Sequence, residues 1–422
     1  MTLNRLFKFQ LVLVVVLLLA GSVIAQINQP SPFPDRVILN LTEETTTSVA
    51  VTWRTDTTIN IGSIELQPAA TMIVPDKSLT FSANTITQIY NWEEEPEVAS
   101  NHHSGVLTRL VPGKKYSYRV GSPGFWSEWF DFQTPSTETS SFSFIYLGDP
   151  QNDIKSEWSR VIRNAYRHQP NCGFILYAGD LINRPVRDTE WHEWFQAGSF
   201  IYSTVPQVMT PGNHDYDGFI LAPHWNSQFT LPDNSPPGLE GTCYFTDYKN
   251  LRLISIDTAT GRELRDENSY EMTAQTAWLD SVLLANSKEW VIVTTHLPFY
   301  SPKENRDNHR IRRNFQPIME KHGVDLVLTG HDHSYARGRA TDNPEAEPIV
   351  YVVSVSGPKM YEVGDNKDWI EHKGENKQLY QVITIDNDEL LYQSFTTDGM
   401  LFDEFIIKKA NNGKNIFIDM KP

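Results

Sequence analysis

Five apolar runs of the sequence each end at side chains that can bind a metal ion. The runs are Phe142–Leu147, Phe174–Ala178, Val208–Thr210, Val291–Thr295 and Leu326–Thr329. The segments that follow them hold, in chain order, Asp149-Pro150-Gln151, Asp180, Asn213-His214-Asp215, His296 and His331-Asp332-His333. These donors are oxygen and imidazole atoms without a thiolate, a set that suits Zn, Mn or Fe.

Short apolar runs of this kind predict buried strands, and they alternate with segments of helical spacing, which favours an α/β domain. The carboxyl ends of strands in such a sheet share one edge, so donors far apart in the sequence converge there. The glycines before Asp149, Asp180, Asn213 and His331 fit a chain that turns sharply as it leaves the sheet. Two Asp, one Asn and three His are too many for one ion that keeps an open position. They indicate two ions about 3.5–4 Å apart, bridged by a carboxylate.

The order Gly-Asp, Gly-Asp, Gly-Asn-His-Asp, His and Gly-His-x-His resembles that of the calcineurin-like metallophosphoesterase superfamily. The segments Pro34–Val37 and Val49–Thr55 are similar to the fibronectin-III-like N-domain of its purple acid phosphatase branch. The resemblance covers residues 35–410. A lone Gly-Asp is usually only a turn. All five motifs in this order, each after a predicted strand, are specific for the superfamily.

The resemblance implies a role for each of these residues. Asp149 and His333 would bind one ion, Asp180 would bridge both, and the second ion would be held by Asn213, His296 and His331. A hydroxide held by the metals would attack phosphorus. His214 is similar to the family's catalytic histidine, which donates a proton to the leaving group, and Asp215 is expected to orient it.

The sequence departs from the family pattern at two positions. Purple acid phosphatases have a Tyr that binds Fe(III) three residues after the bridging Asp, where this chain has Asn183. We therefore expect no purple colour. Relatives often have His where this chain has Gln151, which is either a weaker direct ligand or an outer-shell residue. Asn183, Arg184 and His309 are candidates for contacting the substrate or for an outer shell around the ligands, and exposed surface positions are the alternative for Arg184 and His309.

Three regions are predicted along the chain. Residues 1–25 form a signal peptide, with Arg5 and Lys8 before an apolar run and a cleavage site at Ala25. Residues 35–135 alternate apolar and polar side chains and predict a β-sandwich. Residues 141–410 predict a four-layer αββα domain, with helices over Trp158–Tyr166, Thr273–Leu284 and Arg312–His322.

Composition limits the function further. The 422-residue chain has a formal charge of −16, so nucleic-acid binding is not expected, because phosphate backbones are held by Lys and Arg. After signal cleavage no permanent membrane span is predicted, which places the protein in the periplasm, at the cell surface or outside the cell. Cys172 and Cys243 are the only cysteines, and the sequence leaves their pairing open.

The sequence thus predicts an exported two-metal enzyme that hydrolyses small phosphate monoesters, like an acid phosphatase. A phosphodiesterase or nucleotide pyrophosphatase on the same scaffold remains an alternative, because the difference lies in pocket loops. A cell-surface binding protein with a weakened metal site is a second alternative, raised by Gln151 and Asn183.

Overall fold

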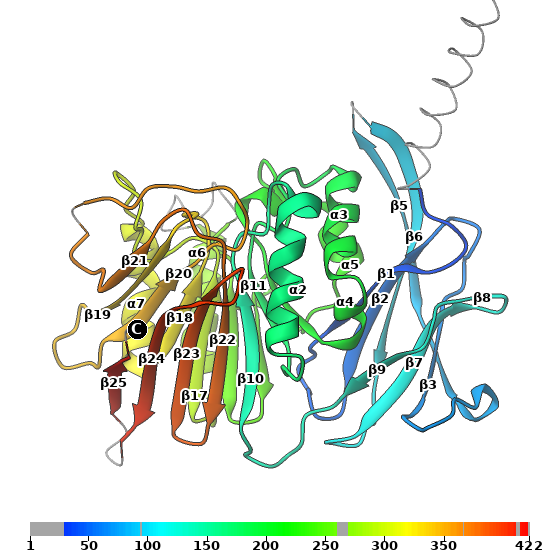
Figure 1. Ribbon diagram of the computed structural model, residues 1–422, viewed down its shortest axis with the longest axis horizontal. Helices are drawn as coiled ribbons and strands as arrows, with labels where there is room; N and C mark the ends of the chain where they lie inside the picture. Colours follow the sequence, from blue (N-terminus) through cyan, green and yellow to red (C-terminus); the bar gives the residue numbers. More distant parts are fainter. Residues whose placement is uncertain (1–28, 93–94, 260–268, 366, 411–413, 421–422) are drawn as a thin grey trace, which may run out of the picture.

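The structure is a computed structural model, and it describes residues 29–92, 95–259, 269–365, 367–410 and 414–420. A β-rich N-terminal region lies beside a larger region of sheets and helices (Figure 1). The signal peptide predicted for residues 1–25 lies outside the described residues.

The N-terminal region is a β-sandwich. Its elements are β1 (Asp35–Asn40), β2 (Val49–Thr55), β3 (Ser63–Pro68), the 3₁₀ turn η1 (Pro75–Lys77), β4 (Leu79–Ser82), β5 (Asn84–Trp92), β6 (Glu95–Leu107), β7 (Lys115–Ser122), β8 (Phe125–Trp126) and β9 (Phe130–Gln133). Strands β1, β2, β6 and β5 form one layer, and β4, β3, β7, β8 and β9 form the other. Val49, Val51 and Trp53 point into the core between them, as their alternation predicts. The intervening residues of β2 are buried too, because its other face packs against the second region.

The second region contains the remaining strands and the helices. Its strands are β10 (Phe142–Leu147), β11 (Ile175–Ala178), β12 (Gln207–Thr210), β13 (Tyr216–Asp217), β14 (Ile220–Leu221), β15 (Tyr244–Tyr248), β16 (Leu251–Ile256), β17 (Trp290–Thr295), β18 (Leu326–Thr329), β19 (Tyr335–Ala340), β20 (Ile349–Val353), β21 (His372–Gly374), β22 (Leu379–Asp386), β23 (Glu389–Thr396), β24 (Leu401–Lys409) and β25 (Asn415–Asp419). Its helices are the π-helical turn η2 (Ile154–Trp158), α2 (Ser159–His168), α3 (Asp188–Gly198), α4 (Phe200–Thr204), the 3₁₀ turn η3 (Asn213–Asp215), α5 (Pro223–Gln228), α6 (Tyr270–Leu284) and α7 (His309–His322).

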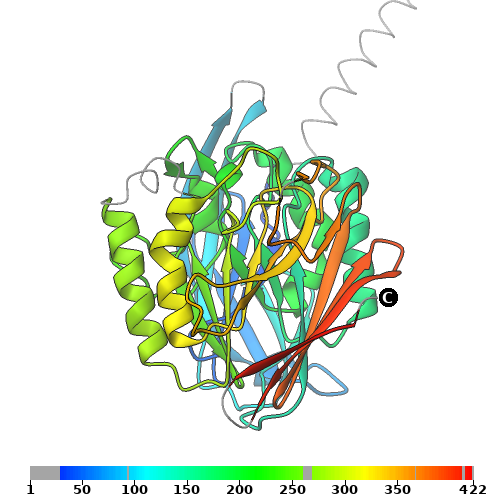
Figure 2. The same cartoon turned by 90° about the vertical axis from the view of Figure 1, so that its left-hand side faces the viewer.

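Two sheets lie face to face between two layers of helices (Figure 2). Alternation along β10 shows how the sequence builds these layers: Phe144 and Tyr146 face the core between the sheets, whereas Ile145 and Leu147 face α2 and α3. A third core packs α6 and α7 against the other sheet. The predicted fold class, a β-sandwich followed by an αββα domain, is confirmed.

The two regions share one sheet, a feature that the sequence did not predict. Strand β1 runs parallel to β12, with Asn40 opposite Gln207, and this pairing joins the two regions into an eleven-stranded sheet. The amide of Asn40 also donates to the carbonyl oxygen of Gln207 over 3.2 Å. The sandwich is therefore attached directly beside the strands that carry the predicted ligands.

The predicted elements agree with the structure within a few residues. The helices predicted to begin at Thr273 and Arg312 begin at Tyr270 and His309. Trp191, Trp194 and Phe195 pack into the core from α3, as their spacing predicts. Cys172 and Cys243 are both buried and are not joined.

Candidate metal centre

The carboxyl ends of five strands carry the predicted metal ligands. Strands β10, β11 and β12 run parallel in one sheet, and β17 and β18 run parallel in the other. Asp149, Asp180 and Asn213 follow the first three, and His296 and His331 follow the last two. The structure brings these side chains together at one edge, where the two facing sheets meet.

The glycines before the ligands serve two different purposes. Gly179 has a φ of 86°, the sharp turn that the sequence predicts. Gly212 has an ordinary φ of −105°, and a Cβ there would lie 2.2 Å from the backbone nitrogen of Asp180. A Cβ on Gly330 would lie 2.4 Å from a carboxylate oxygen of Asp149. The turn explanation was therefore wrong for Gly212 and Gly330. At these two positions the missing side chain instead allows the ligand loops to approach each other closely.

Four of the candidate ligands have a left-handed backbone. The φ angles are 45° at Asp149, 53° at Asp180, 72° at His331 and 43° at His333. Each such residue costs on the order of 1–3 kcal/mol unless the surroundings enforce it, and such residues cluster at functional sites. The backbone N–H of His331 donates to both carboxylate oxygens of Asp149, at 2.9 and 2.7 Å, which holds the two loops in register.

The donors form two groups that share one residue. Asp180, His296 and His331 have donor atoms within 4.8 Å of one another, and so do Asp149, Asp180 and His333. Asn213 joins the first group, because its Oδ1 lies 3.2 Å from Nε2 of His296. Asp180 is therefore the residue shared by two groups that could each hold a metal ion.

The ring of His296 shows that one group is arranged for an ion. Its Nδ1 donates a hydrogen bond to the carbonyl oxygen of Ala178 over 2.8 Å, which leaves Nε2 as the nitrogen that could bind a metal ion. This Nε2 lies 3.2 Å from Asp180 Oδ2, Asn213 Oδ1 and His331 Nδ1 alike. Two side-chain oxygens and a second imidazole nitrogen around one ring nitrogen form a donor set that a metal ion could share.

Burial and charge set the titration of the centre. Burial raises the pKa of Asp149 well above its usual range. Burial alone would lower the pKa of His296, but the neighbouring carboxylate of Asp180 raises it to about 9. Burial opposes ionisation of Asp180, yet His296 holds the pKa of that carboxyl below its usual value. The centre thus concentrates buried carboxylates that need positive charge beside them.

Gln151 lies beside the second group, that of Asp149, Asp180 and His333. Its amide nitrogen is 2.8 Å from Asp180 Oδ2 and 3.1 Å from Nε2 of His333. Among the described residues, its Oε1 is buried without a hydrogen-bond partner, and so is Nδ1 of His333. This group is therefore less completely supported than the one around His296. Whether Gln151 binds metal directly stays a prediction.

The structure corrects the expected role of Asp215. Nδ1 of His214 donates to the backbone carbonyl oxygen of Asn183 over 2.7 Å, so Asn183 orients the ring. Asp215 instead accepts from the backbone N–H groups of Asp180, at 3.0 Å, and Gly212, at 2.7 Å. A carboxylate so engaged with two ligand loops positions the backbone, and the orienting role given to Asp215 was wrong.

Glu190 of α3 supports the Asn183 loop, a role that was not predicted from the sequence. Its Oε2 accepts from the backbone N–H groups of Asn183, at 2.7 Å, and Arg184, at 3.0 Å. A glutamate on an amphipathic helix gives no signal of its own in the sequence. Its role follows only from the packing of α3 beside the end of β11.

The other two candidate substrate residues lie at the margins. Arg184 is exposed and, with Asn183, lines a hollow of about 700 Å³ at the start of α3. The side chain of His309 is 56 % exposed, and its ring nitrogen lies 3.9 Å from Asp307. Asp307 is not a candidate ligand, so the surface alternative fits His309 better.

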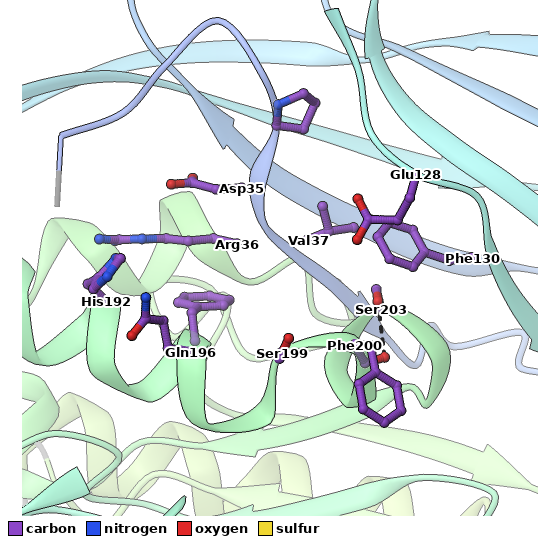
Figure 3. Close-up of a pocket in the computed structure, with 12 residues that line it drawn as sticks. Asp35, Arg36, Val37, Glu128, Phe130, His192, Gln196, Ser199, Phe200 and Ser203 are labelled. Atoms are coloured by element: carbon purple, nitrogen blue, oxygen red, sulfur yellow. Dashed lines mark hydrogen bonds between the residues drawn. The ribbon is translucent and has the colours of Figure 1, made fainter. Parts of the chain in front are cut away.

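A pocket of about 260 Å³ lies at the junction of the two regions and is separate from the metal centre (Figure 3). It is lined by Asp35 and Arg36 of β1 and by His192 of α3, among others. Arg36 lies 2.8 Å from Asp188 at the start of α3. The pocket contains none of the predicted site residues, and its Arg36 takes part in joining the two regions.

Family models match both regions of the chain. Residues 142–335 match "Calcineurin-like phosphoesterase", and residues 34–134 match "Purple acid Phosphatase, N-terminal domain". Purple acid phosphatase 21 of Arabidopsis thaliana is 23% identical over 270 residues, which are 62% of this chain and 57% of that protein. Acid phosphatase type 7 of Danio rerio is 25% identical over 356 residues, which are 74% of this chain and 78% of that protein.

Solved structures share the fold. The purple acid phosphatase PPD1 of yellow lupin superposes with a TM-score of 0.75 at 18% identity, covering 90% of this chain and 75% of that one. PhoD superposes with a TM-score of 0.65 at 13% identity, covering 92% of each chain. The chain spans a little over half of the length of the first plant relatives that it matches. It therefore consists of a purple acid phosphatase N-terminal domain followed by a calcineurin-like metallophosphoesterase domain.

Proposed function

We propose that the protein is a two-metal phosphoesterase that hydrolyses small phosphate monoesters. The observation that carries this proposal is the carboxylate of Asp180, which belongs to two donor groups. Its Oδ1 also accepts from the backbone N–H of His214 over 2.7 Å. Two cation sites and a histidine beside them are the parts that hydrolysis of a phosphoester needs.

The residues present fit two metal ions. Asp149, Asp180 and His333 would hold one, with Gln151 beside it, and Asp180, Asn213, His296 and His331 would hold the other. Ions bound there supply neutralisation of phosphate charge and a nucleophile at neutral pH. Oxygen and imidazole donors favour Fe, Zn or Mn.

His214 is the general acid of this proposal. The carbonyl of Asn183 keeps a proton on Nδ1, so the proton that can be transferred resides on Nε2. The backbone N–H of His214 donates to Asp180 Oδ1, so His214 adjoins the carboxylate that both donor groups share. A protonated Nε2 there donates to the oxygen of the departing alcohol, while Asn183 keeps the ring oriented.

The relatives support monoester hydrolysis. Those named above are called acid phosphatases. Loops outside the shared centre determine which substrate is preferred. We therefore propose a class of substrate, small phosphorylated molecules.

Metal analysis combined with turnover tests this function. Protein with two bound metal ions per chain is expected to hydrolyse p-nitrophenyl phosphate faster than bis-p-nitrophenyl phosphate, and His214→Ala is expected to lose most of its turnover of an alkyl phosphate, whose leaving group needs a proton. Preference for the diester would favour the phosphodiesterase alternative. A metal-loaded protein that hydrolyses neither compound would overturn the enzyme assignment in favour of a binding protein.

We further propose that the protein is exported through its N-terminal leader. In the part of the chain that the structure describes, no helix is long and apolar enough to cross a membrane. Fractionation of the source cells, followed by sequencing of the mature N-terminus, is expected to find Gln26 first in the exported fraction. A chain that retains residues 1–25 in the membrane fraction would contradict this.

A further inference from the structure

Two loops bring positive charge to the His333 side of the metal centre. The loop after β17 carries Lys303, and the loop after β20 carries Lys359 and Tyr361. All three side chains are partly buried. Lysines held close to a metal centre have little of the freedom of ordinary surface lysines, so their position calls for a physical explanation.

Tyr361 connects these lysines to a candidate metal ligand. Its backbone N–H donates to the carbonyl oxygen of His333 over 2.9 Å, and its ring centroid lies 4.8 Å from that of His333. The ammonium of Lys303 lies 3.7 Å from the centre of the Tyr361 ring, and that of Lys359 lies 5.6 Å from it. Both cations are thus separated from a ligand of the first ion by a single aromatic ring.

Neither ammonium has a carboxylate within ion-pair distance among the described residues, although the chain carries a formal charge of −16. The neighbouring Arg306 differs, because it forms an ion pair with Asp332. Lys367 is also engaged, since it donates to the carbonyl oxygen of Arg306 over 3.2 Å. Lys303 and Lys359 therefore bring two positive charges to one ring without a carboxylate partner among the described residues, and an anion bound beside that ring would be attracted to both.

The loops that carry the two lysines are fixed to the metal centre. The N–H of Gly357 donates to the carbonyl oxygen of Asp149 over 2.9 Å, and a Cβ on Gly357 would lie 2.4 Å from that oxygen. The N–H of Gly364 donates to the carbonyl oxygen of Pro302 over 2.8 Å, which joins the two loops. The backbone of the two loops is therefore held in place before any ligand arrives, which lowers the entropy cost of binding.

We propose that Lys303 and Lys359 form a subsite for a second anionic group of the substrate. The preferred substrates are then phosphate esters or anhydrides that carry another phosphate or a carboxylate near the phosphate that is hydrolysed. Ammonium groups suit this role because each is a compact charge with three donors, and hydrogen bonds between ions are the strong ones. This inference rests on the proposed function and adds the class of substrate.

The test compares substrates with and without the second charge. The double variant Lys303→Gln/Lys359→Gln is assayed with p-nitrophenyl phosphate, which has none, with adenosine diphosphate and with phosphoenolpyruvate. We expect KM for adenosine diphosphate, phosphoenolpyruvate or both to rise by roughly tenfold or more, as loss of a charge-assisted contact predicts. KM for p-nitrophenyl phosphate is expected to change by less than about threefold, because that substrate does not use the subsite. The substrate whose KM rises identifies the second anionic group: phosphate for adenosine diphosphate, carboxylate for phosphoenolpyruvate.

Direct binding provides a second measurement. Calorimetric titration with methylenediphosphonate, compared with methylphosphonate, is expected to show a preference for the diphosphonate that the double variant loses. Lys303→Arg/Lys359→Arg should retain most of it, and Lys321→Gln on the exposed face of α7 should leave it unchanged. Equal losses for all substrates, or an unchanged preference, would overturn the subsite. Absence of all turnover would overturn the proposed function instead, and the diphosphonate titration would still test the lysines.

Discussion

Nδ1 of His214 lies 2.7 Å from the backbone carbonyl oxygen of Asn183. Because a carbonyl oxygen only accepts, Nδ1 keeps its proton and Nε2 is the nitrogen that exchanges one. Asn183 lies in the loop that begins with Asp180, whose carboxylate is shared by both donor groups. One loop therefore orients both the bridging carboxylate and the proposed acid.

Removal of the acid is expected to depend on the leaving group. His214→Ala should lower kcat by about 10²–10⁴ for an alkyl phosphate, whose alkoxide needs a proton. The loss should be smaller for p-nitrophenyl phosphate, because p-nitrophenolate leaves without one. Steady-state rates for a series of esters with different leaving-group pKa values measure this. Metal content should stay at two ions per chain, and an equal loss across the series would contradict the acid role.

The loop itself can be loosened without touching the ligands. Glu190→Gln removes the carboxylate that accepts two backbone N–H groups at Asn183 and Arg184. We expect kcat to fall by about tenfold and stability by about 1 kcal/mol, because a neutral amide oxygen accepts these bonds more weakly than a charged carboxylate oxygen. Glu193→Gln, one turn later on α3, serves as the matched control. Unchanged kcat in Glu190→Gln would show that the loop does not orient His214.

The strands and the ligand order could be predicted from the sequence because each apolar run is short, alternates with helices and stops at a donor. Burial in two sheets leaves a strong pattern, as in Phe142–Leu147 and Leu251–Ile256, which match β10 and β16. Convergence of Asp149, Asp180 and His331 then follows from the shared edge of parallel strands.

Contacts that depend on packing geometry could not be predicted. The orientation of His214 uses a main-chain oxygen, which every residue has, so no side-chain pattern reveals it. The pairing of β1 with β12 joins segments more than 160 residues apart through a single register position. Lys303 and Lys359 lie near the same Tyr361 ring only because the loops after β17 and β20 lie side by side.

The shared carboxylate predicts different metal losses for different ligands. Asp180→Asn should weaken metal binding at both sites, because a neutral amide replaces the carboxylate charge that both donor groups share. Asn213→Ala should mainly weaken the ion near His296. Metal content after dialysis, measured by elemental analysis, is expected to fall toward zero in the first variant and toward one ion in the second. Two retained ions in Asp180→Asn would contradict the bridging role.

Gln151 offers a gain-of-function test. Replacing its neutral amide by imidazole in Gln151→His supplies a stronger donor beside Asp180 and His333. We expect the first ion to bind about tenfold more tightly, with little change at the second. Competition with a chelator measures both affinities. Tighter binding at the second site alone would show that the two groups are assigned to the wrong ions.

Stability of the metal-free protein is expected to fall as the pH rises from about 6.5 to about 9. Burial alone would lower the pKa of His296, but Asp180 and Asp149 raise it to about 9, above the unfolded value of about 6.5. Its contribution, about 3 kcal/mol, is complete below pH 6.5 and is lost as the pH passes 9. Bound ions require the neutral ring, so metal-loaded protein should not show this loss. Calorimetric Tm values at pH 6, 7.5 and 9 should therefore diverge between chelated and metal-loaded protein. Parallel Tm values for the two forms would contradict the assignment, and so would the same divergence in His296→Asn.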